Sequence, residues 1–81
     1  MEAAWKLGNT YLMIQDCESG WDFTILDLLF SEIDGGVVES MNFTLEEVRD
    51  DIMADYNLCS LICEEVEYDK LMEQIEANRK V

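Results

Sequence analysis

The chain has 81 residues, of which 19 are acidic and 5 are basic, and its net charge of −14 exceeds the roughly 2 to 8 charges that keep a small domain soluble. Because 49% of the residues are apolar and 10% are aromatic, the composition argues against a disordered chain and predicts a single folded domain over residues 1–81. The negative field repels nucleic acid and anionic lipid, and no run of about 18 apolar residues is present, so we expect neither a direct nucleic-acid binder nor a membrane protein.

The first part of the chain predicts a β-hairpin. Residues 10–15 combine β-branched, aromatic and aliphatic side chains, which is typical of a strand. Residues 18–20 form a turn cluster, and apolar and polar residues then alternate over residues 21–29. We expect residues 1–9, which precede the first strand, to be a flexible lead.

A second turn is predicted at residues 34–36. Their sequence, Asp-Gly-Gly, is typical of a turn because glycine readily adopts positive φ, and residues 37–39 can then pair as a third strand. Residues 58–66 are compatible with a fourth strand or with a helical turn, and we favour a short strand. The expected sheet is therefore an antiparallel meander of three to four strands.

Two helices are expected after the meander. Thr44 and Glu47 form a capping box, since each side chain can accept a hydrogen bond from the amide of the other residue, so a helix should begin at Leu45. Asn57 is typical of a residue that ends a helix. The apolar stripe of this helix consists of Leu45, Val48, Ile52 and Tyr56, and that of the second helix consists of Tyr68, Leu71, Met72 and Ile75. The predicted fold class is therefore α+β, with two helices packed on the sheet.

The residue types argue against an enzyme and against a bound cofactor. Histidine, the commonest general base and metal ligand, is absent. The negative field disfavours the thiolate that a cysteine nucleophile needs, so Cys17, Cys59 and Cys63 are expected to fill the core. An odd number of cysteines fits a reducing compartment, and we expect a cytoplasmic protein.

The hairpin turn carries carboxylates at alternate positions, which is similar to a calcium-binding loop. The carboxylates are Asp16, Glu18 and Asp22. The segment departs from that pattern because Gly20 stands fifth rather than sixth and Asp27 stands where a bidentate glutamate is needed. We therefore interpret the segment as an ordinary turn and expect no metal site.

The first predicted helix has a face made almost entirely of carboxylates, namely Glu46, Glu47, Asp50, Asp51 and Asp55. At a rise of about 1.5 Å per residue they place one charge per about 3 Å of helix axis, close to the roughly 3.4 Å between phosphates of one DNA strand. Glu64 and Glu65 extend the acidic set before the second helix. The alternative is a solvated helix face without a partner, and the helix dipole alone accounts for acidic residues in the first turn.

Three segments carry a resemblance to a known family. Residues 15–24 and 32–36, followed by Leu-Glu-Glu-Val-Arg-Asp at 45–50, resemble a small acidic domain of the large polyvalent protein-associated group. That group is found in conjugative elements and phages of gut Firmicutes, and the resemblance covers roughly residues 10–76. The matching turns are structural rather than catalytic, so the resemblance supports the fold more than an activity.

The resemblance implies a setting among mobile genetic elements, whose small acidic proteins blunt host defence. By this analogy we expect a DNA mimic, that is, an anti-CRISPR or antirestriction protein. Its carboxylates would bind the basic groove of a nucleic-acid-binding nuclease, and the expected residues are Glu46, Glu47, Asp50, Asp51, Asp55, Glu64 and Glu65. The alternative is a protein-protein interaction module of a conjugative element that binds through Trp21, Leu28 and Phe30 and does not inhibit. The oligomeric state stays open, since the apolar run at residues 26–30 suits a dimer as well as a core.

Overall fold

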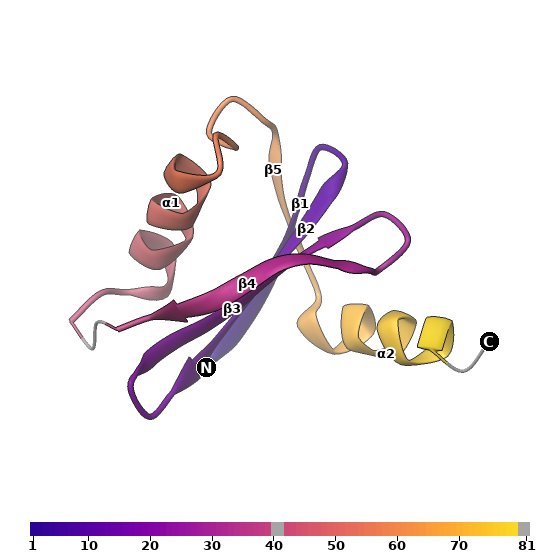
Figure 1. The fold of residues 1–81 in the computed structure, drawn as a ribbon, viewed down its shortest axis with the longest axis horizontal. Helices are drawn as coiled ribbons and strands as arrows, with labels where there is room; N and C mark the ends of the chain where they lie inside the picture. Colours follow the sequence, from indigo (N-terminus) through magenta and orange to yellow (C-terminus); the bar gives the residue numbers. More distant parts are fainter. Residues whose placement is uncertain (40–41, 80–81) are drawn as a thin grey trace.

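The computed structural model, which describes residues 1–39 and 42–79, contains one antiparallel sheet with a helix on each face (Figure 1). The strands are β1 (Glu2–Leu7), β2 (Thr10–Cys17), β3 (Gly20–Asp27), β4 (Glu32–Val38) and β5 (Cys63–Val66), and the helices are α1 (Leu45–Asp55) and α2 (Tyr68–Arg79). The strand order is β4-β3-β2-β1-β5, and every neighbouring pair is antiparallel. The predicted α+β class and the hairpin at residues 18–20 are confirmed.

Strand β1 lies inside the sheet, so the prediction of a flexible lead over residues 1–9 is wrong. It pairs with β2 on one side and with β5 on the other. Ala4 is buried against one face of the sheet, and Trp5 and Leu7 are buried against the other. Gly8, at a φ of 60°, makes the turn into β2. A strand that is buried on both faces lacks the apolar-polar alternation by which a half-buried strand is recognised.

Residues 34–36 lie within β4, so the predicted second turn is also wrong. The two glycines leave room for Phe23 on the neighbouring strand β3. A Cβ added to Gly35 would lie 3.0 Å from the carbonyl oxygen of Phe23, and a Cβ added to Gly36 would lie 3.3 Å from its ring. The glycines therefore permit the close packing of two strands rather than a reversal of the chain.

The chain reverses a few residues earlier, between β3 and β4. The Asp27 carboxylate accepts hydrogen bonds from the amides of Leu29, at 2.8 Å, and Ser31, at 3.0 Å. Phe30 adopts a φ of 63°, in the left-handed region. The side chain of Asp27 thus closes this turn without a glycine, as aspartates commonly do.

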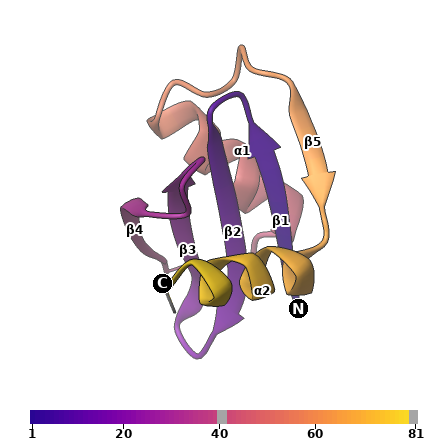
Figure 2. The ribbon, with the colours of Figure 1, turned by 90° about the vertical axis from the view of Figure 1, so that its right-hand side faces the viewer.

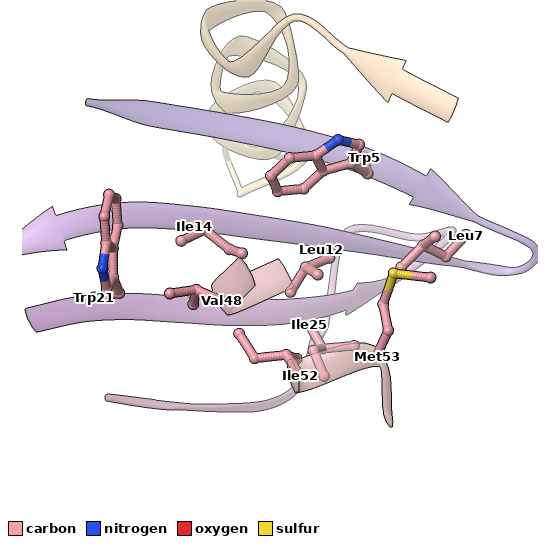
Figure 3. Packing of buried hydrophobic residues seen from close by; sticks show 9 residues of the cluster. All are labelled: Trp5, Leu7, Leu12, Ile14, Trp21, Ile25, Val48, Ile52 and Met53. Atoms are coloured by element: carbon pink, nitrogen blue, oxygen red, sulfur yellow. The ribbon is translucent and has the colours of Figure 1, made fainter. Parts of the chain in front are cut away.

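The two faces of the sheet bury separate cores. The core under α1 consists of Trp5, Leu7, Leu12, Ile14, Trp21 and Ile25 from the strands with Val48, Ile52 and Met53 from the helix (Figure 3). The core under α2 is smaller and consists of Ala4, Met13, Leu26, Leu71 and Ile75. Successive residues of β2 alternate between these cores, as the period of a strand requires. Because α2 contributes only two buried residues, it is anchored more lightly than α1.

Both predicted ends of α1 are confirmed. The Glu47 amide donates to Thr44 Oγ1 at 3.2 Å, and the Thr44 amide donates to Glu47 Oε1 at 3.0 Å. The helix ends at Asp55, and Asn57 follows the C-cap at a φ of 57°. These contacts are local in sequence, which is why the residue pattern alone was sufficient to predict them.

The favoured strand assignment within residues 58–66 is confirmed for the last four residues, which form β5. The cysteine prediction is wrong, since Cys59 and Cys63 are exposed and Cys17 is only partly buried. A hollow lined by Cys59 and Cys63 separates α1 from β5, so the helix does not cover this edge of the sheet. The thiols of Cys59 and Cys63 therefore line an open hollow and do not enter the packed core.

Replacing Gly35 by valine should destabilise the fold although valine ordinarily favours strands. The new Cβ would lie 3.0 Å from a backbone oxygen that cannot move without shifting β3. We expect the free energy of unfolding, measured by urea denaturation, to fall by about 1 to 3 kcal/mol. Val37→Thr, at an exposed position of the same strand, should change it by less than about 0.5 kcal/mol. An equally or more stable G35V protein would contradict this account of β4.

Candidate functional site

The outer face of α1 is the most strongly charged surface that one element of the structure presents. Val48, Ile52 and Met53 point into the core, and this fixes the opposite side of the helix toward solvent. All the predicted carboxylates of this helix are exposed: Glu46, Glu47, Asp50, Asp51 and Asp55. The structure therefore places these five predicted residues on one exposed element.

Two of these carboxylates already have partners. Glu47 closes the capping box with Thr44. Asp50 forms an ion pair at 3.0 Å with Arg49, the one basic residue of α1. Arg49 is also held inward, because its guanidinium lies 5.4 Å from the centre of the Trp5 ring in a cation–π contact. The charge of Arg49 is thus directed toward the sheet and away from the rest of the acidic face.

The remaining three carboxylates, Glu46, Asp51 and Asp55, form no ion pair or side-chain hydrogen bond within residues 1–39 and 42–79. We call these three residues the free carboxylates of α1. Their negative charge is compensated only by solvent and salt. They are the part of the predicted site that is available to a partner without breaking an existing contact.

Glu64 and Glu65 do not form one surface, because adjacent residues of a strand point to opposite faces. Glu65 pairs with Trp5 and shares the hollow beside α1 with Arg49. Glu64 pairs with Lys6 and lies on the side of α2. Only Glu65 can therefore extend the acidic face of α1, and Glu64 lies on the opposite face of the sheet.

The predicted apolar contact residues are also divided. Trp21 belongs to the core, with 9% of its surface exposed, so it cannot form part of an exposed contact patch. The ring of Phe30 stacks on Tyr11, with 5.5 Å between the ring centres, and is half-buried. Leu28 is exposed, as is its neighbour Leu29, which the sequence interpretation missed. The exposure of Leu29 could have been inferred from the apolar run at residues 26–30, because this run has more apolar residues than one face of a strand can bury.

The carboxylates that resembled a calcium loop do not converge. Asp16 lies on the α1 side of the sheet with its pair Trp21, whereas Asp22 is paired with Gln15 and lies on the α2 side. Across residues 1–39 and 42–79, no group of three or more His, Cys, Asp or Glu side chains is arranged to hold a metal ion. In the same part of the chain, no helix is long and apolar enough to cross a membrane.

A hydrogen bond between distant residues fixes the C-terminal end of α1. Tyr56 donates its hydroxyl to Asp34 Oδ2 at 2.6 Å, and the Gly35 amide donates to Asp34 Oδ1 at 2.8 Å. These two donors lower the pKa of Asp34, and the hydrogen bond to the carboxylate raises the pKa of Tyr56. Because the partners are 22 residues apart, sequence spacing gave no signal for this contact.

Comparison with known proteins shows a match to a protein family. A family model described as Large polyvalent protein-associated domain 16 matches residues 1–78, which include all five strands. The match begins earlier than the sequence resemblance and includes β1. No curated protein and no solved structure matches the chain.

The hydrogen bond between Tyr56 and Asp34 should make stability depend on pH in a way that Tyr56→Phe removes. The folded-state pKa of Asp34 is lowered from 3.8, so this contribution is present above about pH 4 and is lost as the pH falls through the folded value. The folded-state pKa of Tyr56 is raised from 10.0, so the contribution is present below pH 10 and is lost as the pH rises beyond the folded value.

We therefore expect the difference in unfolding free energy between wild type and Y56F to be largest near neutral pH and to shrink toward both extremes. Urea titrations at acid, neutral and alkaline pH measure this difference. Tyr68→Phe, which removes a phenol at the other helix, is the matched control and should leave the Asp34-linked acid titration in place. A difference for Y56F that does not vary with pH would contradict the contact.

Proposed function

The chain belongs to the family of large polyvalent protein-associated domain 16, and we propose that it acts as a non-catalytic inhibitor whose α1 face occupies a basic, nucleic-acid-binding groove of a protein partner. The observation that carries the proposal is the set of free carboxylates of α1, which are exposed on a helix whose single arginine is turned inward. In this proposal Glu46, Asp51 and Asp55 take the place of phosphates against Arg and Lys side chains.

The spacing of the charges supports this substitution. The five acidic residues lie within ten positions of α1, which is about 15 Å of axis at about 1.5 Å per residue. The density of about one charge per 3 Å is close to that of one DNA strand, at about one per 3.4 Å. A groove that recognises a strand through its phosphates therefore meets a comparable linear charge density on α1.

The rigidity of α1 supports the proposal as well. The capping box fixes one end of the helix, the Tyr56 hydroxyl fixes the other, and two of its residues, Val48 and Ile52, are at most 1% exposed in the core between them. A helix held in this way keeps its carboxylates in one arrangement before binding, so less conformational entropy is lost on association. Glu47 and Asp50 then contribute mainly by holding the helix and by their long-range charge.

The partner that suits this surface is a nuclease of host defence, of the restriction or CRISPR type, which must hold nucleic acid in a basic channel. Competition for that channel would require no catalytic residue in the inhibitor. It would also depend strongly on salt, because the interaction is between exposed charges. Such an encounter would take place in the cytoplasm, where these nucleases act.

A second candidate is an interaction module that binds a protein without inhibiting it. The observation that favours it is the exposed pair Leu28 and Leu29 in the turn between β3 and β4, of which Leu29 is 73% exposed. Binding through these side chains would vary little with salt and would be lost in the variant L28A/L29A. It would be retained when the free carboxylates of α1 are neutralised.

Neutralising the free carboxylates of α1 with the triple variant E46Q/D51N/D55N should weaken the competition of the domain with DNA. The assay measures the anisotropy of a labelled duplex bound to purified restriction and RNA-guided nucleases, one enzyme at a time, as the domain is added. For a target enzyme, we expect the wild-type domain to displace the duplex. We expect the triple variant to need roughly tenfold more protein, because at least about 1.4 kcal/mol of interaction is lost. Raising the salt from about 50 to about 200 mM should weaken the wild-type effect.

The matched control is D22N/E32Q/E76Q, which also removes three negative charges but takes them from the opposite face of the sheet. It should displace DNA as the wild type does, because the charges that it lacks do not lie on α1. Displacement that E46Q/D51N/D55N retains in full would contradict the proposed role of α1. If the wild-type domain displaces DNA from none of the enzymes in the panel, the proposed class of partner is contradicted.

A further inference from the structure

A groove lies between α2 and the sheet, on the face opposite to α1. Two hydrogen bonds hold α2 across the strands in the arrangement that Figure 2 shows. At its N-terminal end the Tyr68 hydroxyl donates to Gln15 Oε1 at 2.8 Å, and near its C-terminal end Asn78 Nδ2 donates to the Leu29 carbonyl at 2.7 Å. Between these contacts the helix and the sheet leave a groove of about 230 Å³. Its shape is therefore set by contacts at both ends of the helix.

The groove has an apolar interior and an acidic rim. Met13 and Leu26 from the strands and Met72 and Ile75 from α2 provide its apolar lining. The rim carries three carboxylates, from Asp22, Glu32 and Glu76, against the single guanidinium of Arg79. None of these three carboxylates forms an ion pair within the part of the chain that the structure describes. An apolar lining with an anionic rim suits a side chain that has a long aliphatic stem and a cationic head.

The groove opens toward a free sheet edge. In the described part of the chain, β4 pairs with β3 and has no neighbour on its other side. Thr24, in the lining of the groove, pairs with Gly35 of β4, which has no side chain to close the groove at that point. On the same strand Ile33 is 57% exposed and Val37 is 49% exposed. An unpaired strand of this kind offers its backbone amides and carbonyls to an added strand.

The charge of the protein decides between the possible added strands. A second copy of this chain would bring another 14 negative charges to an edge that already carries Glu32 and Asp34. The field in the groove is also negative: burial raises the pKa of the Tyr68 phenol, and the nearby carboxylates of Glu2, Asp22 and Asp69 raise it further. A basic segment would be attracted where a second copy would be repelled.

We propose that the β4 edge and this groove bind an extended basic segment of another protein, which adds to the sheet beside β4 and places a Lys or Arg side chain over Gly35 into the groove. The backbone of the segment would pair with β4, and alternate side chains would point to the face of α2. This site lies on the opposite face from the free carboxylates of α1, so the inference does not depend on the proposed function.

The test uses a capped, fluorescein-labelled nine-residue peptide of alternating valine and lysine as the probe. We expect it to bind the wild-type domain and to protect backbone amides of β4 from hydrogen exchange, as measured by NMR. The rim variant D22N/E32Q/E76Q should weaken binding about tenfold, whereas E46Q/D51N/D55N, with the same net charge, should weaken it less than about twofold. All six substituted residues are exposed, so both variants should retain the circular dichroism of the wild type.

A second peptide separates strand addition from general charge attraction. It has the same sequence, but alternate backbone amides are N-methylated, so it keeps its lysines and cannot pair along one edge. We expect it to bind at least tenfold more weakly than the first peptide. Equal weakening by the two protein variants, equal binding of the two peptides, or no binding of the first peptide would overturn the inference. A dimer joined through β4, detected by sedimentation and by protection of the same amides without peptide, would also overturn it.

Discussion

The three inner strands of the sheet, β1, β2 and β3, contribute buried residues to both faces, and the rest of the structure depends on this constraint. Leu12 and Ile14 enter the core under α1 while Met13, between them, enters the core under α2. Each helix therefore covers one face, and within the described residues no charged side chain is buried. The two candidate binding surfaces are separate because the sheet lies between them.

The elements that the sequence predicted correctly are those whose causes lie within a few residues. The capping box of Thr44, the left-handed Asn57 and the hairpin at residues 18–20 are all of this kind. The errors have causes far away in the chain. The position of β1 depends on β5, about sixty residues later, and the conformation of Gly35 depends on Phe23 of the neighbouring strand. Neither contact leaves a pattern in its own segment. Local residue preferences therefore predicted a flexible lead at residues 1–9 and a turn at residues 34–36.

The same distinction applies to the candidate site. The acidic face of α1 was predictable because helical periodicity alone places its carboxylates on one side. Glu64 and Glu65 are adjacent in sequence, and only their assignment to a strand separates them. The inward position of Arg49 required Trp5, which came from the segment expected to be a flexible lead. The groove beside α2 was not predictable from the sequence. Its lining comes from three strands and one helix, and tertiary packing alone sets the relative positions of these elements.

The short strand β5 has a consequence for the order in which the protein assembles. Strands β1 to β4 follow one another through short turns, so their pairing closes only small loops. Strand β5, with four residues, must find β1 across most of the chain, and α2 follows it directly. The C-terminal unit of β5 and α2 is therefore expected to dock last and to open first. Such partial opening would uncover Ala4, Met13 and Leu26 while the meander and α1 remain folded.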